Sequence, residues 1–524
     1  MYECPGCGQN LRFDIPSQML KCTHCDSLYD PYQYNAGEDA KESVNFDVTV
    51  FTCPQCGGEI MSTDTSAAEF CSYCGGSTIL SSRISKEHKP GYIIPFQKTK
   101  EDCKKAYHSM LKGAFFAPSE LKDPAYIDSF RGIYMPYWLY HIEQHGPFTL
   151  KGEKSYRRGN YIYTDHYNLN GSINAYYKGM SYDASSTFDD RISLDIAPYD
   201  VRGMKEFTPA ILSGFYADTS DVDCNIYIED ASEFANENSY RSVVSAFSGM
   251  TIKSPESNAG SLLHTRCEAI DSAMFPVWFM SYRNKDRVAY TIINGQTGEA
   301  VADLPVARRK YIICSLILAV PIFLLLGIFT MTPKFALALA MIMGGVVSAI
   351  NYFELRAIVR KDSRSYDKGY LYKRGELDQY KAEPSAKKPG KPTASKTAPT
   401  LVFVIIAVAF MGMISAIVST MFSAGFFFIA APILSLVFMC LSFKPYKKLD
   451  SSRGMPTFVL IFITVIIAAL IALVNPVSDI YYYAATVLVL VSVILTNLGV
   501  INKHNVLSTR PLPQFNRKGG DDNA

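Results

Sequence analysis

Six apolar stretches near the C-terminal end constrain the fold of this chain more than any other feature. They cover approximately residues 311–330, 335–353, 400–421, 424–443, 457–474 and 481–501. Each is close to the ~20 residues that a helix needs to cross the hydrocarbon core of a bilayer. Because backbone groups in lipid must be satisfied internally, we expect an all-α membrane domain of six transmembrane helices.

The distribution of Lys and Arg predicts the orientation of these helices. Arg308, Arg309 and Lys310 precede the first stretch, and the connections after the second and fourth stretches are also basic. The alternate connections are short and nearly uncharged. Basic connections stay on the cytoplasmic side, so we expect a multi-pass protein of the cell membrane with cytoplasmic N- and C-termini. The predicted units are helices 1 and 2 at 308–355, a basic cytoplasmic loop and linker at 356–399, helices 3 and 4 at 400–443, helices 5 and 6 at 457–501, and a cytoplasmic tail at 502–524.

The interiors of the six stretches contain no Asp, Glu, Lys, Arg or His. Such residues usually mark ion or proton pathways inside membranes. A transporter is therefore a weaker alternative than a membrane-fixed binding protein. The basic loop lies where it can contact anionic membrane lipids, although ordinary orientation signalling also accounts for its charge.

Four Cys-x-x-Cys pairs at the N-terminal end predict two metal sites. Fourteen residues separate the two pairs within each of the two frames. Two such turns place four thiolates around one tetrahedral zinc ion and leave no coordination position open. We expect two Zn²⁺ ions, one in a zinc ribbon at 1–30 and one in a second ribbon at 49–82, joined by a linker at 31–48. The predicted ligands are Cys4, Cys7, Cys22 and Cys25, and then Cys53, Cys56, Cys71 and Cys74.

Disulfides or a redox-active dithiol are the alternatives to zinc. The chain starts without a secretory signal, which favours a reducing compartment and therefore the metal. Zinc ribbons often bind nucleic acid, but residues 1–90 carry 6 Lys and Arg against 12 Asp and Glu. An acidic surface repels phosphates. We therefore expect the ribbons to bind protein or to be purely structural, and nucleic-acid binding remains the alternative.

Residues 90–305 are long enough for a folded cytoplasmic domain. Thr99 and Asp102 predict a capped helix, and strand patterns dominate beyond it. The runs 133–142 and 274–282 are β-prone, and Asn294–Gly298 predicts a hairpin connection. An α+β fold follows for this domain.

Catalytic patterns in this domain are weak. His141, Glu143 and His145 do not have the spacing of a helical metalloprotease motif, and a solvated strand face is the simpler interpretation. A second group consists of acidic and hydroxyl residues, Asp183, Asp189 and Asp190 with Ser185 and Ser186. Their side chains can bind a cation, or they can serve only in turns and helix caps. No phosphate loop or nucleophile elbow occurs in the sequence, so we do not expect an enzyme.

Several segments of this domain carry a resemblance to known proteins. They are Asp-Ala-Ser-Ser at 183–186, the run at 207–215, Phe-Pro-Val-Trp at 275–278 and Asn-Gly-Gln-Thr-Gly-Glu at 294–299. With the cysteine pairs, the chain resembles bacterial membrane-anchored zinc-ribbon proteins over most of residues 50–305. Members are sometimes labelled as transcription-factor-type or replication-restart helicase-like zinc ribbons, and the missing phosphate loop excludes the helicase label here.

Some members of that family are similar to components encoded beside phage-shock protein A. The resemblance implies a membrane platform that recruits phage-shock protein A during envelope stress. We therefore expect a scaffold whose cytoplasmic part brings protein partners to the bacterial cell membrane. A membrane-tethered nucleic-acid binder and a transporter or membrane enzyme are the alternatives.

Overall fold

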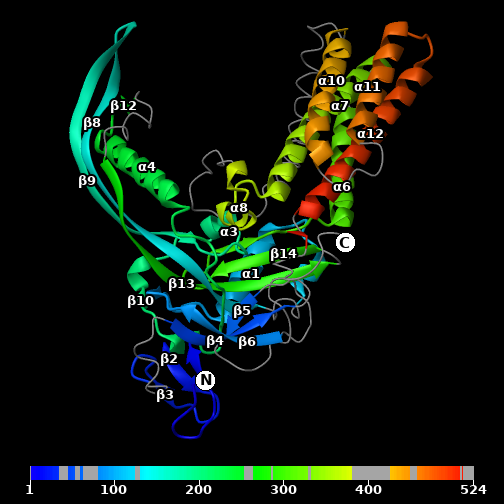
Figure 1. The fold of residues 1–524 in the computed structure, drawn as a ribbon. Helices are drawn as coiled ribbons and strands as arrows, with labels where there is room; N and C mark the ends of the chain where they lie inside the picture. Colours follow the sequence, from blue (N-terminus) through cyan, green and yellow to red (C-terminus); the bar gives the residue numbers. More distant parts are fainter. Residues whose placement is uncertain are drawn as a thin grey trace.

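The computed structural model divides the chain into a small N-terminal sheet, a β-rich body and a C-terminal helical bundle (Figure 1). The fold is therefore multidomain, as the sequence predicts. The residues that the structure describes are 2–34, 45–53, 59–62, 81–123, 130–252, 264–284, 287–327, 332–380, 425–448, 457–507 and 510–511.

The N-terminal sheet is formed by three short antiparallel strands, β1 (Leu11–Asp14), β2 (Met19–Cys22) and β3 (Leu28–Tyr29). We call residues 2–34 the first ribbon. Its alternating apolar residues Leu11 and Phe13 are buried in the same core as residues of the body. The backbone N–H of Phe13 also donates to the carbonyl of Ser213 at 3.0 Å. The first ribbon is therefore packed firmly on the body.

The body is built on one sheet of 13 strands, whose centre is the antiparallel pair β8 (Arg131–Arg158) and β13 (His264–Asn284). The main path runs β10-β7-β13-β8-β11-β5-β4-β6, while β9, β12, β14, β15 and β16 pair beside it. The remaining bounds are β4 (Asn45–Thr52), β5 (Glu59–Ser62), β6 (Ser81–His88), β7 (Tyr92–Ile93), β9 (Tyr161–Asp183), β10 (Lys205–Glu206), β11 (Tyr216–Ala217), β12 (Thr251–Ile252), β14 (Arg287–Asn294), β15 (Ala300–Ala302) and β16 (Arg510–Pro511).

Strands from the predicted second ribbon belong to this large sheet. β4 pairs with both β5 and β6, and β5 pairs with β11 of the body. β4 also begins at Asn45, inside the segment predicted as a linker. The sheet therefore continues across the boundaries expected at 48 and between 82 and 90.

Several predictions about the middle of the chain are confirmed. Helix α1 (Lys100–Gly113) begins with a capping box formed by Thr99 and Asp102. The β-prone runs 133–142 and 274–282 lie in β8 and β13 and pair with each other. Strands β14 and β15 flank the predicted hairpin connection, and Gly298 has a φ of 84° there. A glycine suits this position because other residues rarely adopt such a φ.

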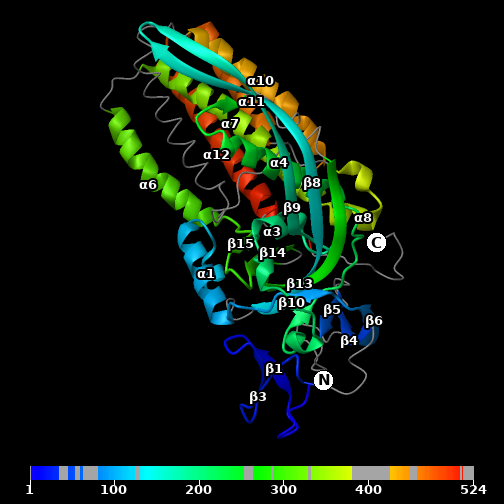
Figure 2. The ribbon, with the colours of Figure 1, turned by 90° about the vertical axis from the view of Figure 1, so that its left-hand side faces the viewer.

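The strands β8 and β9 form a long antiparallel hairpin that leaves the body as a curved arm (Figures 1 and 2). Helix α4 (Ile228–Ala246) packs along the arm: Ala231 and Ala235 share a core with Tyr140 and Ile142 near its base, and Val243 meets Leu150 and Leu169 further towards its tip. Short helices complete the body. They are α3 (Asp190–Asp195), and the 3₁₀ turns η2 (Ser119–Lys122), η3 (Val201–Gly203) and η4 (Pro209–Leu212).

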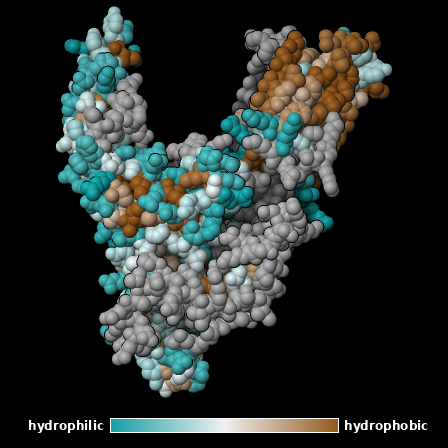
Figure 3. Space-filling view, in the orientation of Figure 1, coloured by the Kyte–Doolittle hydropathy of each residue, from teal (hydrophilic) through white to brown (hydrophobic). Residues whose placement is uncertain are grey.

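The C-terminal bundle contains four helices that are long and apolar enough to cross a membrane. They lie in α7 (Pro333–Ser363), α10 (Gly425–Lys448), α11 (Thr457–Val474) and α12 (Asp479–Leu507). Their outer surface is strongly apolar (Figure 3). These helices indicate a membrane association, although four candidate spans are found in the described residues where the sequence predicts six.

The two other predicted spans have different outcomes. Helix α6 (Arg308–Gly327) covers most of the first predicted span, but residues 328–330 at the end of that span lie outside the described residues, and α6 is not among the four candidates. The predicted span at 400–421 lies outside the described residues altogether. Six spans therefore stay a prediction.

Beyond α7, the first part of the basic loop packs on the body, near α3, and not on the helical bundle (Figure 1). Arg364 has a φ of 43° and turns the chain away from α7. Helix α8 (Lys368–Arg374) and the turn η5 (Leu377–Gln379) follow. The basic side chains of Arg364, Lys368 and Lys373 pair with carboxylates of the body. Contact of the basic loop with lipid stays a prediction.

Candidate metal centre

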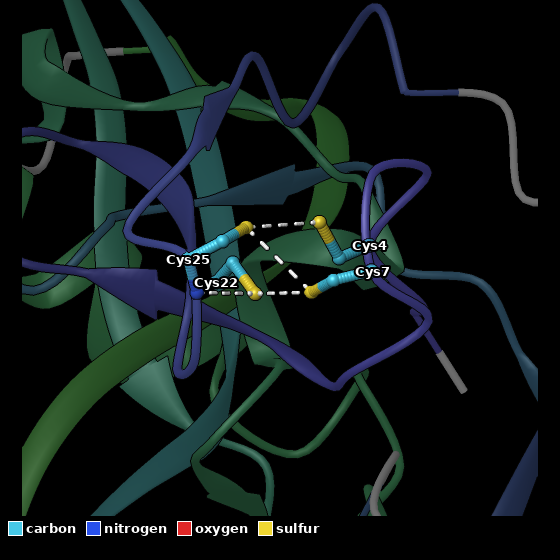
Figure 4. A group of neighbouring side chains, drawn as sticks. All are labelled: Cys4, Cys7, Cys22 and Cys25. Atoms are coloured by element: carbon cyan, nitrogen blue, oxygen red, sulfur yellow. Dashed lines mark hydrogen bonds between the residues drawn. The ribbon is translucent and has the colours of Figure 1, made fainter.

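Four cysteines of the first ribbon converge on one point (Figure 4). Their sulfur atoms all lie within 4.8 Å of one another. The sulfur atoms are 3.6 Å apart for Cys4 and Cys25, 3.4 Å for Cys7 and Cys22, and 3.6 Å for Cys7 and Cys25. A tetrahedral ion with zinc–sulfur bonds of about 2.3 Å requires sulfur separations of about 3.8 Å. The group can therefore hold a metal ion with little adjustment.

Local backbone geometry explains how the two turns bring the sulfurs together. Gly8 and Asp26 each follow the second cysteine of a pair, and their φ values are 70° and 57°. Glycine adopts this left-handed conformation freely, and Asp is among the few other residues that tolerate it. The second turn, Cys22–Cys25, is therefore followed by the same left-handed conformation as the first, although it lacks the glycine. Asp26 also pairs with Lys21 at 3.0 Å.

Polar groups around three of the four sulfurs stabilise their anionic form. At Cys7 a backbone hydrogen bond with Gln9 has the same effect, but hydrogen bonds with the other cysteines and burial outweigh it and raise the pKa to about 12. The Tyr29 hydroxyl lies 3.5 Å from Cys4 Sγ, and this hydrogen bond lowers the pKa of Cys4 to about 6. Hydrogen bonding with Ser27 lowers the pKa of Cys25. The backbone N–H groups of His24 and Cys25 donate to Cys22 Sγ at 3.4 and 3.5 Å. Thiolates are the form that binds metal, so these contacts favour occupation of the centre.

Only part of the second cysteine frame can be compared with its prediction. Cys53 is buried just after β4, whereas Cys56, Cys71 and Cys74 lie outside the described residues. In the part of the chain that the structure describes, the first frame is the one group of three or more such ligands with metal-binding spacing. The second zinc ion stays a prediction.

The histidines of β8 share one face of the strand, which the sequence left open. His141 is buried, and its Nε2 lies 3.0 Å from Asp271 Oδ2 on β13. His145 faces His264 across the strand pair, with ring centroids 5.3 Å apart. No third metal ligand joins these pairs within the described residues. The solvated strand face expected here fits the exposed His145 but not the buried His141.

The acidic group around residues 183–190 performs cap and turn chemistry. Asp189 accepts hydrogen bonds from the N–H groups of Arg191 and Ile192 and thereby caps α3. Ser186 donates to Asp221 through both its N–H and its hydroxyl, at 2.7 Å each. Three carboxylates with metal-binding spacing do not occur among these described residues.

Sequence reasoning missed the residues that meet this acidic group from the other side. Arg364, Tyr366 and Lys368 contact Asp189 and Asp190 across almost two hundred positions of the chain. The available signal was charge complementarity, since an acidic tract at 183–190 matches a basic tract at 364–374. Charge alone does not pair one tract with another, so the contact required the fold.

Comparison with known proteins identifies a relative but no function. A protein described as "Uncharacterized protein YdjG" from Bacillus subtilis (strain 168) is 26% identical to this chain over 321 residues. The match covers 91% of that protein and 59% of this chain. No protein-family model and no solved structure matches the chain. The resemblance to zinc-ribbon membrane proteins therefore stays a prediction, and a function must be argued from the geometry.

Proposed function

We propose that this protein is a zinc-binding scaffold of the cell membrane, whose cytoplasmic part recruits protein partners to the bilayer. The observation that carries the proposal is that the first ribbon, the body and the helices are connected by packing and by the chain itself. Leu11 and Leu20 of the first ribbon share a core with the body, and the body continues directly into α6. A partner bound by the ribbon or the body is thereby fixed to the membrane.

Zinc is the metal that this proposal assigns to the cysteine centre. Four thiolates in a tetrahedral arrangement are typical of structural zinc, and they leave no position for a water or a substrate. When bound, zinc supplies folding free energy to a ribbon that is too small to have an adequate core of its own. We propose a second zinc ion of the same kind at Cys53, Cys56, Cys71 and Cys74.

The charge of the helix ends supports six spans with a cytoplasmic body. Helices α7 and α10 run parallel, because Ser348 lies against Ser435 and Tyr352 stacks near Phe438 one turn further on. The ends of both helices that point towards the body are basic. The opposite ends carry a single cation, Lys334, within the described residues. Because basic ends tend to stay in the cytoplasm, this asymmetry supports a cytoplasmic position for the side that faces the body.

Recruitment during envelope stress is the finer part of the proposal. Its support is the resemblance to proteins associated with phage-shock protein A, together with a closed metal centre that has no chemistry of its own. The acidic balance of residues 1–90 favours a protein partner over nucleic acid. The proposal assigns no catalytic residue.

The experiment that tests the proposal is proximity labelling from the N-terminus in intact cells, with and without membrane-damaging stress. We expect one set of labelled proteins to depend on the cysteine centre and to be lost in a Cys22→Ser variant. Detergent extracts that yield no partner dependent on residues 1–305 would contradict the scaffold. Retention of nucleic acid by the protein at low salt would instead support the alternative of a nucleic-acid binder.

A further inference from the structure

The segment that follows α7 is held tightly against the body. We call residues 364–374, which include α8, the clasp. Asp367 and Leu371 of the clasp are buried. A Cβ atom added at Gly369 would lie 3.2 Å from the Tyr227 hydroxyl and 3.3 Å from a methyl group of Val222. Such close approach means that the clasp and the body are fitted to each other at this point.

Charged and polar contacts hold the clasp in place. Tyr366 donates its hydroxyl proton to Asp189 Oδ2 at 3.0 Å, and the N–H of Lys368 donates to Asp190 Oδ2 at 2.7 Å. Arg364 lies 3.6 Å from Asp189. Two further ion pairs lie at the edge of the clasp, between Lys368 and Asp230 on α4 and between Lys373 and Asp221.

The buried part of this interface contains more carboxyl groups than cations. Asp183, Asp189 and Asp367 are buried and Asp190 beside them is half-buried, and Arg364 pairs with this group through Asp189 and Asp367. Asp183 is 2% exposed, and its Oδ2 atom has no hydrogen-bond partner among the described residues. Several carboxylates this close cannot all remain ionised away from water.

Among the remaining titratable and charged groups of the packed elements, the cations Lys368 and Lys373 pair with Asp230 and Asp221 instead of with the buried carboxyl groups. Burial, with Asp367 nearby, raises the pKa of both Asp183 and Asp190 well above the ordinary value. The other groups that face the interface are Tyr137 on β8, Tyr182 on β9, Tyr199 before η3, Asp218 and Asp221 before α4, Tyr227, Asp230 and Glu233 at the start of α4, and Tyr366, Lys368, Lys373 and Tyr380 in and after the clasp.

We propose that the clasp is a proton-linked latch, which docks α7 onto the body while Asp183 and Asp190 carry protons and weakens when they ionise. The geometry supports this, because the clasp follows directly on a helix able to cross the membrane and covers the carboxyl groups from water. Acidification of the cytoplasm therefore tightens the connection between the membrane helices and the body. This latch does not depend on the identity of any partner.

The sign of the effect follows from the two states of the interface. In the undocked state the carboxyl groups are solvated and have pKa values of about 4. In the docked state the pKa values of Asp183 and Asp190 are raised, so that the docked state binds more protons. Docking is therefore strongest at low pH and is lost as the pH rises towards the docked-state values. Between the two values it weakens about tenfold per pH unit for each proton.

Hydrogen–deuterium exchange of the full-length protein in lipid nanodiscs tests the latch. We expect protection of the amides at 364–374 to fall between pH 5.5 and pH 8.5, after correction for intrinsic exchange. Asp183→Asn replaces the carboxyl group with a neutral one of the same shape, so it should remove the pH dependence. Asp190→Asn should reduce it as well. Asp195→Asn, on the same helix but at its surface, should leave the wild-type response unchanged.

Two results would overturn the latch. One is equal protection of the clasp across this pH range in the wild-type protein, and the other is a wild-type pH response in both Asp183→Asn and Asp190→Asn. Protection of β13 and β14 reports whether each variant is folded. Trypsin cleavage after Lys373 and Arg374 in the wild-type protein, normalised to a peptide substrate at each pH, gives the same answer without any variant.

Discussion

The cysteine centre and the clasp interface both gather several acidic groups into a small volume, but they are built in opposite ways. The four cysteines lie within 22 residues of one another, while the clasp joins Asp189 to residues more than 170 positions later. The sulfurs have the spacing to surround a cation. In the proposed latch, carboxyl groups that exceed their cations carry protons instead. Crowded acidic groups would thus be neutralised by a metal in one region and by protonation in the other.

The largest expected effect is the loss of the metal from the cysteine centre. Cys22→Ser replaces a fully buried ligand with one that binds zinc poorly. Structural zinc contributes an apparent 10 to 16 kcal/mol in small ribbons, on the order of the whole stability of the unit. We expect the variant to lose one zinc ion per chain, measured by elemental analysis, and to unfold residues 2–34, measured by hydrogen exchange.

A matched control for this loss is Cys267→Ser, since Cys267 lies on β13, away from the centre. It should keep the full zinc content. A Cys22→Ser protein that still holds as much zinc as the wild type would contradict the centre described here. Cys71→Ser separately tests the second predicted ion, and it should remove one zinc ion as well.

The next effect concerns the packing that makes the first ribbon part of the body. Phe13 is 5% exposed and belongs to a core shared by both. Phe13→Ala should lower the free energy of unfolding by about 3 to 5 kcal/mol, because burial is lost and a cavity remains. Phe115, which is 63% exposed, is the control, and its replacement by alanine should change stability by less than about 0.5 kcal/mol. Denaturant unfolding measures both, and equal effects would show that the ribbon is only loosely attached.

The third effect tests how closely the clasp fits the body. Gly369→Ala should cost about 1 to 3 kcal/mol, since the added methyl group presses on Tyr227 and Val222. Gly113 ends α1 with no atom within 4 Å of a Cβ placed there, so Gly113→Ala should be neutral or slightly stabilising. Exchange protection at 364–374 should fall in the first variant alone. If both variants leave the clasp protected, the fit at Gly369 is looser than its geometry indicates.

The contrast between the two regions also explains what the sequence could reveal. Ligand spacing is local, so the pattern of Cys4, Cys7, Cys22 and Cys25 predicted their convergence before any fold was available. The capped helix at Thr99 and the hairpin at Gly298 were predictable for the same reason. Pairing of β5 with Tyr216–Ala217 depends on the tertiary fold. The boundary expected between the second ribbon and the middle domain therefore divides a continuous sheet. Burial of Asp183 and Asp367 was hidden because polar residues usually indicate surface.

The smallest expected effect separates the buried part of the clasp from its edge. Lys373 and Asp221 form an ion pair at 3.1 Å, with side chains that remain 41% and 23% exposed. A pair so accessible to water is worth about 0 to 1 kcal/mol and is screened by salt. Lys373→Gln should therefore change clasp protection less than Gly369→Ala does, and its effect should vanish in 0.5 M salt. A large, salt-independent loss on Lys373→Gln would instead mean that the exposed edge holds the clasp, and the buried carboxyl groups would then be free of any role in docking.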